Sequence, residues 1–313
     1  MLQSSLLKEF IMQEGFSACG FARAEKLSKE RETELREWLA RGEHGDMEYL
    51  ARNVEKKVNP CMLVEGAKTI VSAAINYCPN EAIQREKEAQ PLCLAKYAYG
   101  TDYHEIVKQK LRNVLKKIGL EEGIAARVFV DTAPIDEKYW AEQAGLGWRG
   151  KNSQLIIPKM GSYFFLGEIV LTQEVDKYDE KAKNRCGKCN ACIEACPTKA
   201  LHGNGTLDAR KCLSYLTIEY RGDLPNDAKK KMSPCFYGCD RCADACPWNK
   251  RFARITSVET FRAREQILAM STHDWEHLSV EKYRELFRNS AVKRAKYEGL
   301  MRNIRAVLEE NSE

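Results

Sequence analysis

Two cysteine runs near the middle of the chain restrict its fold and chemistry more than any other feature. Residues 186–197 read C-x2-C-x2-C-x3-C-P, and residues 235–247 read C-x3-C-x2-C-x3-C-P. In bacterial ferredoxins, the first spacing holds a [4Fe–4S] cube with three thiolates and sends the fourth to a neighbouring cluster. Two copies predict two clusters that exchange ligands, and therefore an electron path. A zinc site or a disulfide framework fits less well, because zinc pairs usually lie further apart and disulfide frameworks are typical of small secreted chains.

Nine cysteines between residues 186 and 246 are available for the eight ligands that two cubes require. If the fourth cysteine of each run crosses over, the first cluster is held by Cys186, Cys189, Cys192 and Cys246. The ligands of the second cluster are then Cys196, Cys239 and Cys242, with either Cys212 or Cys235 as the fourth. Spacing alone does not decide between those two. The scattered Cys19, Cys61, Cys78 and Cys93 are predicted to be small buried hydrophobic residues.

Length and composition indicate a multidomain globular protein. A chain of 313 residues has room for two or three domains, and a net charge of +5 permits a nucleic-acid partner without requiring one. The N-terminus predicts an amphipathic helix with Leu6, Leu7, Phe10 and Ile11 on one face, and lacks the features of a signal peptide. No apolar stretch approaches the length of a membrane span. Thirteen cysteines without an export signal predict a reducing cytoplasm, where thiolates hold metal instead of forming disulfides.

The pattern along the chain predicts an α+β protein with three parts. Residues 1–175 read as an α/β domain, residues 176–250 as a ferredoxin-like domain entered through a charged linker at 177–185, and residues 251–313 as helices. Strands are predicted at 69–77, 94–99, 127–130, 154–157 and 163–171, the last two joined by a turn. Helices are predicted at 104–118, 280–287 and 300–308.

Three short motifs suggest chemistry that their context does not support. Gly145–Gly150 matches the dinucleotide fingerprint G-x-G-x-x-G, but a helical pattern precedes it and a strand follows, which inverts the required order. Its glycines are expected to allow tight turns or close approach. His273–His277 matches H-x-x-E-H without a third ligand, and an exposed helix start is the simpler interpretation. Asp102–His104 lacks the glycine of the D-x-H-x-x-G cobalamin signature, so it gives no reason to place His104 on a cobalt.

Taken in order, several segments resemble the tRNA epoxyqueuosine reductases, which are iron–sulfur and cobalamin enzymes. The ordered combination covers nearly the whole chain, although each segment alone is weak. Phe236–Cys242, leading into the Cys-Pro-Trp-Asn of 246–249, is particularly characteristic. The other matching segments are Met47–Arg52, Tyr99–His104, Val130–Pro134, Ala144–Asn152, Gly161–Gly167 and the first cysteine run.

The resemblance implies a reaction, its cofactors and its site residues. Members reduce the epoxide of epoxyqueuosine at the wobble position of a tRNA anticodon to queuosine, in the tRNAs for aspartate, asparagine, histidine and tyrosine. They use base-off cobalamin in the α/β domain beside the nearer of two [4Fe–4S] clusters, with an external low-potential electron donor. Transferred to this chain, the proton donor is Asp131, and the fourth ligand of the second cluster is Cys212, which leaves Cys235 as an extra cysteine. The corrinoid pocket is implied at Lys57, Asp102, Tyr103, His104, Asp131, Ser153 and Leu155.

The chemistry is consistent with this resemblance. Converting an epoxide to an alkene and water is expected to need two electrons and a proton, and low-valent cobalt is a strong nucleophile or one-electron reductant. A carboxylic acid in a closed apolar cleft has a raised pKa, so Asp131 is expected to stay protonated at neutral pH. The alternative for Asp131 is a helix N-terminal cap ahead of Pro134.

A basic stretch near the C-terminus offers a surface for RNA phosphates. Its members are Lys282, Arg284, Arg288, Lys293, Arg294, Lys296, Arg302 and Arg305. An ordinary solvated helix surface is the alternative. Longer family members continue into C-terminal helical repeats whereas this chain ends at Glu313, so its tRNA contact is expected to be smaller or differently arranged. Two other functions compete with tRNA modification: a corrinoid reductive dehalogenase, and a ferredoxin-like electron carrier with no substrate of its own.

Overall fold

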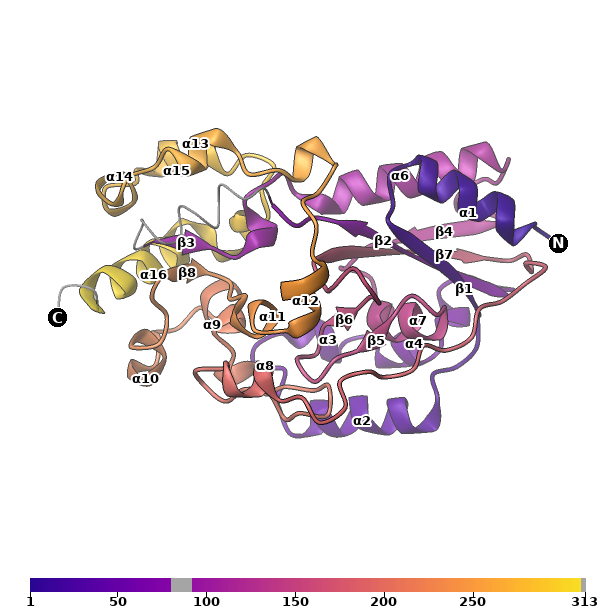
Figure 1. Cartoon of the computed structure of the whole chain (residues 1–313), viewed down its shortest axis with the longest axis horizontal. Helices are drawn as coiled ribbons and strands as arrows, with labels where there is room; N and C mark the ends of the chain where they lie inside the picture. Colours follow the sequence, from indigo (N-terminus) through magenta and orange to yellow (C-terminus); the bar gives the residue numbers. More distant parts are fainter. Residues whose placement is uncertain (80–91, 311–313) are drawn as a thin grey trace.

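A four-stranded antiparallel sheet forms the centre of the N-terminal part (Figure 1). The computed structural model describes residues 1–79 and 92–310. The sheet has the order β1-β2-β7-β4, and each neighbouring pair is antiparallel. The strands are β1 (Ala18–Arg23), β2 (Thr69–Asn76), β4 (Ala126–Phe129) and β7 (Phe164–Leu171). The predicted strands at 69–77, 127–130 and 163–171 are confirmed within one residue at each end.

Helices cover both faces of this sheet. On one face lie α1 (Ser4–Gln13) and α6 (Tyr103–Lys117), which bury apolar side chains against β2, β4 and β7. On the other face lies α7 (Glu137–Gln143), with α2 (Lys29–Ala40) beyond it (Figure 1). The predicted N-terminal helix exists, but its buried residues are Leu7 and Ile11, while Leu6 is 43% exposed. The prediction for Leu6 was wrong because the helix contacts the sheet along a narrower stripe.

The glycine-rich segment after α7 serves backbone packing. Gly145 has a φ of +75° just past the end of the helix, where a left-handed residue commonly terminates a helix. A Cβ on Gly147 would lie 2.2 Å from the carbonyl oxygen of Ile156, because β5 (Trp148–Arg149) and β6 (Leu155–Ile156) pair tightly here. The inverted helix-then-strand order is confirmed. The strand predicted at 154–157 is the short β6, which pairs with β5 in a sheet separate from β7.

The cysteine-rich region consists of short helices connected by loops, and the predicted linker at 177–185 has no regular secondary structure. Its elements are α8 (Ala191–Glu194), α9 (Leu213–Ile218), α10 (Asn226–Lys229), β8 (Cys235–Tyr237), α11 (Arg241–Asp244) and α12 (Pro247–Phe252). Strand β3 (Cys93–Leu94) pairs in parallel with β8. This pairing brings Cys93 and Cys235 to a Cα–Cα distance of 4.6 Å, and the two form a disulfide. Cys93 is buried, as predicted, but the disulfide departs from the expectation that the cysteines of this chain do not pair.

The strand predicted at 94–99 ends after Leu94. The chain turns at Ala95 into a short 3-10 helix, Lys96–Ala98. The side chain of Lys96 is buried, and its ammonium donates a hydrogen bond to Asp244, with Asp240 also nearby. The β-branched and aromatic pattern did not reveal this buried ion pair, which depends on α11, nearly 150 residues further along the chain.

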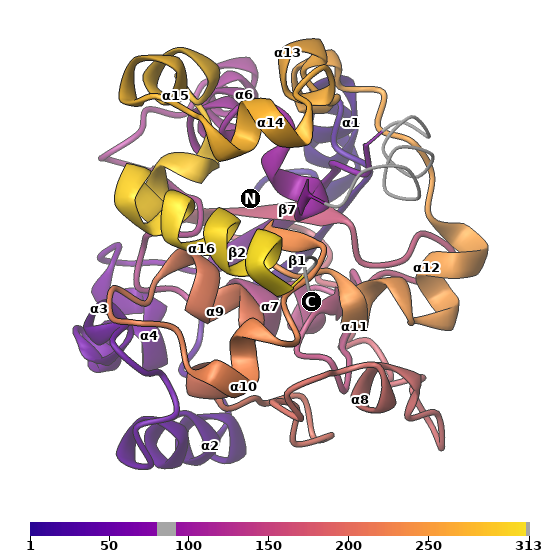
Figure 2. The ribbon, with the colours of Figure 1, turned by 90° about the vertical axis from the view of Figure 1, so that its left-hand side faces the viewer.

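The C-terminal part is helical and packs on the cysteine-rich region (Figure 2). It contains α13 (Glu265–Leu268), α14 (Thr272–Glu276), α15 (Val280–Leu286) and α16 (Lys296–Glu310), so both predicted helices are confirmed. Asn303 on α16 is fully buried, and its amide donates to the carbonyl oxygens of Thr217 and Phe236. Across residues 1–79 and 92–310, none of the helices combines the length and apolarity needed to span a bilayer.

Candidate active site at the junction of the sheet and the cysteine-rich region

A cavity of about 410 Å³ lies where the N-terminal part meets the cysteine-rich region. Its walls come from α2, from α3 (Glu48–Ala51) and α4 (Val54–Val58), from the loop after β4, from the start of α7, and from residues 205–207. Of the predicted site residues, Lys57, Asp131 and Ser153 line this cavity. Leu155 is buried next to it in β6. Five segments that are distant in the sequence therefore converge on one space.

Asp131 follows the end of β4 and adopts a left-handed backbone with a φ of +52°. Its N–H donates to Glu137 Oε1 over 2.5 Å, and its Oδ2 lies 3.1 Å from His104 Nε2. The helix-cap alternative is wrong, because Asp136 caps α7 by accepting from the Tyr139 N–H. The expectation of a closed apolar cleft is also incorrect. The Asp131 side chain is 54% exposed, with a charged neighbour.

His104 connects Asp131 to Asp102. Asp102 caps α6 by accepting the backbone N–H of His104, and its Oδ1 also lies 2.6 Å from the Nδ1 of that imidazole. The imidazole stacks on Tyr103 with 4.2 Å between ring centroids, and Tyr103 stacks on Phe165. Burial opposes the positive charge, but the two carboxylates outweigh it and raise the pKa of His104 to about 9. His104 is thus an imidazolium at neutral pH, with both ring nitrogens donating.

The raised pKa of His104 gives a measurable expectation. Replacing Asp102 by Asn should lower the imidazole pKa by about a unit or more towards its ordinary value, because one of two carboxylates is lost. Since the folded pKa lies above the unfolded one, the stabilising contribution is complete below pH 6.5 and lost as pH rises through about 9. Histidine-selective NMR titration measures the shift. The exposed Asp223→Asn is the control, and an unchanged His104 pKa in Asp102→Asn would contradict the expectation.

The opposite wall of the cavity is held by ion pairs. Arg31 pairs with Asp136 at 2.7 Å, and Arg149 pairs with Glu34 at 2.6 Å. Burial lowers the pKa of Lys57, which forms part of the same wall. The two arginines are neutralised by their acidic partners and hold this wall beside a space that is partly open to solvent. The ammonium of Lys57 can donate to a ligand that carries amide or phosphate oxygens.

Ser153 is fixed by its neighbours. It has a φ of +63°, and its carbonyl oxygen accepts a hydrogen bond from Lys138 Nζ at 2.8 Å. The two residues before it, Lys151 and Asn152, line a second cavity of about 150 Å³ that the first cysteine run also borders. Residues 151–153 therefore separate the two cavities by a single short stretch of backbone.

The first cysteine group surrounds this second cavity, which is lined by Cys186, Cys189, Cys192 and Cys246. Burial raises the pKa of Cys192, and the three other thiols raise it further. The indole N–H of Trp148 donates to Cys186 Sγ over 3.3 Å. Within residues 1–79 and 92–310, no three of these thiols meet the spacing of ligands on a single ion, which a zinc site would require. A cube of iron and sulfur is larger and holds its thiolates further apart.

The second cysteine group lies around α9 and α11 and consists of Cys196, Cys212, Cys239 and Cys242. The pKa of the Cys242 thiol is raised mainly by burial. The neighbouring thiols of Cys239, Cys212 and Cys196 raise it further. The backbone N–H of Ala200 donates to Cys196 Sγ over 3.3 Å. Cys235 is bonded to Cys93 instead. Cys212 therefore lies with Cys196, Cys239 and Cys242, whereas Cys235 is held in a disulfide. The assignment of these thiols as cluster ligands stays a prediction.

The remaining cysteines differ in burial. Cys19 and Cys78 are buried, as predicted, and burial raises their pKa to about 12 and about 11. Cys61 is only half-buried, and its Sγ lies 3.2 Å from the carbonyl oxygen of Ala24.

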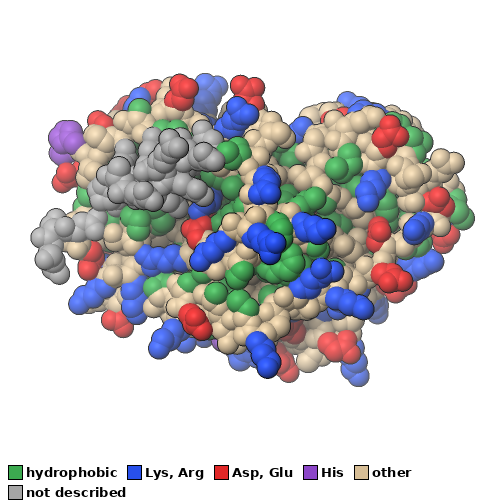
Figure 3. All heavy atoms as spheres, viewed as in Figure 1, with side chains coloured by type: hydrophobic (Ala, Val, Ile, Leu, Met, Phe, Trp, Pro, Cys, Tyr) green, Lys and Arg blue, Asp and Glu red, His purple; other side chains and the backbone are tan. Residues whose placement is uncertain are grey.

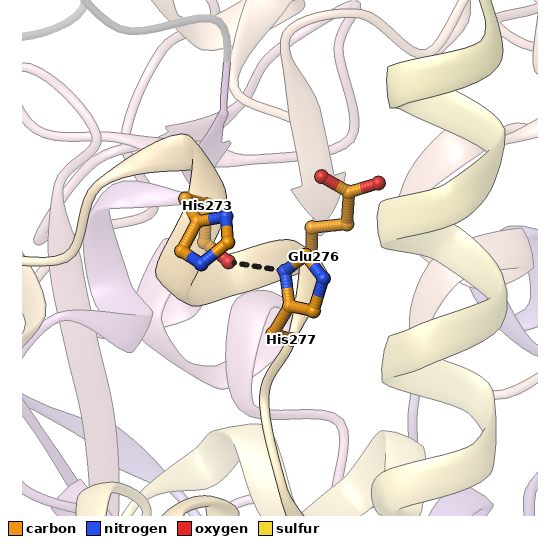
Figure 4. A group of neighbouring side chains, drawn as sticks. All are labelled: His273, Glu276 and His277. Atoms are coloured by element: carbon orange, nitrogen blue, oxygen red, sulfur yellow. Dashed lines mark hydrogen bonds between the residues drawn. The ribbon is translucent and has the colours of Figure 1, made fainter.

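The H-x-x-E-H motif lies on the surface, on α14 (Figure 4). His273, Glu276 and His277 are all exposed, and each has one ligand atom within 4.8 Å of the others. One nitrogen of His277 is already engaged, 3.0 Å from the His273 carbonyl oxygen, and Ser271 with Asp274 forms a capping box at the helix start. The predicted exposed helix start is confirmed, and these residues are not part of the cavity lining.

The basic stretch near the C-terminus is only partly free. Arg302 donates to the carbonyl oxygens of Leu216, Tyr220 and Gly222, and therefore holds α16 against α9. Arg294 pairs with Glu219 and lies over the ring of Tyr49, a cavity-lining residue, at 5.3 Å. The stretch thus borders the cavity mouth, but Arg302 has a structural role that the charge pattern did not reveal.

A second concentration of positive charge was not predicted. Figure 3 shows Lys and Arg side chains gathered over the middle of one face, in the region that α11 and α12 occupy in Figure 1. Lys250 and Arg251 in the last turn of α12 are exposed.

Sequence reasoning missed two acidic residues near Asp131. Glu137 lines the cavity, and Glu168 is fully buried in β7 beneath it. A glutamate within the otherwise apolar run 163–171 was the available signal, since a charged residue in a central strand is seldom buried without a partner.

A ferredoxin-type cysteine repeat, joined to an α+β part with its own cavity, defines an iron–sulfur oxidoreductase. Residues 185–249 match the family model "4Fe-4S double cluster binding domain", and residues 57–132 match "Epoxyqueuosine reductase QueG, DUF1730". An epoxyqueuosine reductase from Leadbetterella byssophila is 44% identical over 98% of both chains. The chain therefore belongs to the epoxyqueuosine reductase family.

Solved structures agree with this assignment. A crystal structure of epoxyqueuosine reductase with an epoxyqueuosine-modified tRNA-Tyr stem loop is similar with a TM-score of 0.85 at 25% identity, covering 98% of this chain and 80% of that one. The enzyme from Bacillus subtilis, described with an aspartate-bearing catalytic loop swung out of its active site, has a TM-score of 0.85 at 26% identity over 98% and 81% of the two chains.

Proposed function

We propose that this protein reduces epoxyqueuosine to queuosine at the wobble position of tRNA, with two [4Fe–4S] clusters and base-off cobalamin. The observation that carries the proposal is the adjacency of two cavities. Ser153 lines the large cavity with Asp131, while Lys151 and Asn152 line the cavity of the first cysteine group. A cluster held by the first cysteine group would therefore be separated from a group bound in the large cavity only by residues 151–153.

The overall reaction fixes what the site must supply. Both C–O bonds of the epoxide break, a C=C bond forms, and the oxygen leaves as water. This takes two electrons and two protons, so the prediction of a single proton was wrong. Asp131 is the proposed donor of one proton. It lines the cavity and can be reprotonated by His104, whose Nε2 lies 3.1 Å from Asp131 Oδ2.

The cysteine groups fit an electron path. The proposed ligands of the cluster near the cavity are Cys186, Cys189, Cys192 and Cys246. Those of the second cluster are Cys196, Cys212, Cys239 and Cys242. Bound clusters would carry electrons one at a time from an external low-potential donor. N–H groups from Trp148 and Ala200 point at cysteine sulfurs, and such hydrogen bonds tune cluster potential.

The large cavity fits a corrinoid in its donor set. Lys57 and the backbone around Ser153 would hold the amide groups of a bound corrinoid by hydrogen bonds, and Leu35 and Pro134 would supply apolar contact. Cobalamin exceeds about 410 Å³, so it would extend through the open side of the cavity. When bound, it would supply a cobalt able to deliver electrons to the epoxide. Asp102, Tyr103 and His104 are not part of the cavity lining, and His104 is connected to it by its hydrogen bond with Asp131. Both ring nitrogens of His104 are engaged by carboxylates.

The proposed RNA surface is the cavity mouth. Tyr49 is 47% exposed and lines the cavity, Arg52 lies beside it, and Arg294 covers the tyrosine ring. An exposed aromatic ring beside positive charges is suited to an extruded base and its phosphates. The substrates implied are the tRNAs for aspartate, asparagine, histidine and tyrosine, which places the enzyme in the cytoplasm.

The function is tested by anaerobic reconstitution with iron, sulfide and cobalamin, followed by incubation with an epoxyqueuosine-containing tRNA-Tyr stem loop and a chemical reductant. Mass spectrometry should show loss of one oxygen atom from the modified nucleoside. Chain that retains iron but binds no corrinoid and leaves the RNA unchanged would support the electron-carrier alternative.

A further inference from the structure

Two glutamates form a pair beneath the floor of the large cavity. Glu168 lies at the centre of β7, is 0% exposed, and has no hydrogen-bond partner at either carboxylate oxygen. Glu137 is the first residue of α7 and lines the cavity. The two carboxyl groups are close enough that Glu137 raises the pKa of Glu168. The site thus has an acidic pair that the reaction as proposed so far does not use.

Other polar groups near Glu168 are also buried without a hydrogen-bond partner among the described residues. Ser72 lies directly opposite Glu168 in the β2–β7 register, and α7 packs over this face of the sheet. The hydroxyl of Ser72 and the indole N–H of Trp140 are also buried, and among the described residues neither has a partner. Natural interiors seldom leave so many buried polar groups unpaired without a functional reason.

One proton shared between Glu137 and Glu168 explains how two carboxyl groups can lie next to each other in the interior. Ionised carboxylates only accept hydrogen bonds, so two of them cannot bond to each other. One proton between Glu137 and Glu168 turns one carboxyl into a donor and gives the other a partner. Burial and then Glu137 raise the pKa of Glu168 well above its usual value, and burial and then Asp131 raise the pKa of Glu137 to about 8.

The charged groups around the pair include both acids and cations. On α7 and the loop before it they are Asp131, Asp136 and Lys138, on α4 Lys57 faces Glu137, and on β4 the exposed Arg127 lies over the ring of Phe129. Asp136 is held ionised by Arg31, because that ion pair outweighs the effect of burial and lowers the pKa of Asp136. Burial, with Asp131 next to Glu137, therefore favours keeping a proton on the pair.

We propose that Glu137 is a second acid of the site, which delivers to the departing epoxide oxygen the proton that Asp131 does not supply, and that Glu168 is the positioning residue that keeps this proton on the pair. The inference rests on the proposed function. Asp131 gives one proton and Glu137 the other, so two protons and two electrons convert the epoxide to an alkene and water. Glu137 Oε1 accepts the Asp131 N–H over 2.5 Å, so the transferable proton is at Oε2. The pair then regains a proton from solvent through the open cavity.

Single-turnover rates across pH 5 to 9 test this assignment in the reconstituted enzyme with the tRNA-Tyr stem loop. Glu137→Gln should slow turnover by about 10²-fold, within the usual contribution of a general acid. Glu168→Gln should keep turnover at pH 6 but shift the alkaline fall in rate by about a unit or more to lower pH, because Glu137 then holds its proton alone instead of sharing it with Glu168. Glu121→Gln, exposed before β4 and at the opposite end of that strand from Asp131, is the matched control.

Thermal unfolding of the same variants gives a readout that does not depend on activity. The folded state holds a proton that the unfolded state releases above the ordinary glutamate pKa, so stability of the wild type should fall as pH rises from about 5 to 9. Glu168→Gln cannot ionise and should gain in melting temperature relative to the wild type over that range. Glu121→Gln should not.

The outcomes separate the two proposals. If the wild type converts no RNA, the proposed function fails, and this inference fails with it. If the wild type converts RNA and Glu137→Gln is equally fast at every pH, only the second-acid assignment is overturned. If the melting-temperature difference between Glu168→Gln and the wild type does not change with pH, the shared proton is overturned.

Discussion

Asp131→Asn should reduce turnover of the epoxyqueuosine stem loop by about 10²- to 10⁴-fold while leaving iron and corrinoid content unchanged. Asparagine has nearly the same shape but cannot give up a proton. It also tolerates the left-handed backbone at this position, where φ is +52°, so the loop should keep its conformation. Single-turnover mass spectrometry measures the rate, and metal analysis with absorption spectra measures the cofactors.

Two controls define what this result means. Asp227→Asn, an exposed residue of α10, should react like the wild type. Asp131→Ala should also be inactive, but it adds backbone strain and is therefore less informative. Turnover in Asp131→Asn within a few-fold of the wild type would refute the proton-donor assignment and favour Glu137 or His104 as the acid.

Replacing Cys212 is expected to remove one complete cluster, which is the second large effect. Cys212→Ala should reduce iron from about eight to about four atoms per chain, because a cube with three of its four thiolates is poorly held. Cys212 adjoins Cys196, Cys239 and Cys242. The variant should bind cobalamin but lose turnover with an external electron donor.

Cys235→Ala is the matched control for this cluster. Cys235 is bonded to Cys93 across the β3–β8 pairing, and its sulfur is therefore not directed at the cluster group. Iron content and reduced-state electron paramagnetic resonance spectra should match those of the wild type. If Cys235→Ala loses four irons and Cys212→Ala loses none, the proposed ligand set is wrong.

Much of the cysteine arrangement followed from spacing. A cube bound by C-x2-C-x2-C must take its three thiolates from one short turn, so local sequence determines the geometry. The fourth ligand of the second cluster is different, because the spacing admits either Cys212, 27 residues before Cys239, or Cys235, four residues before it. The pairing of β3 with β8 brings Cys235 to Cys93 in a disulfide, which supports the proposed choice of Cys212.

The sequence by itself determined the elements with strong periodicity and the cysteine groups, because each depends on neighbours a few residues away. Only the tertiary structure decided the acid–base arrangement. His104, Asp131 and Glu137 come from α6, the loop after β4 and α7, and Glu168 meets Glu137 only because α7 packs over the β2–β7 face. Protonation depends on burial and on charges that distant segments bring within a few ångströms, and no local pattern in a sequence encodes those distances.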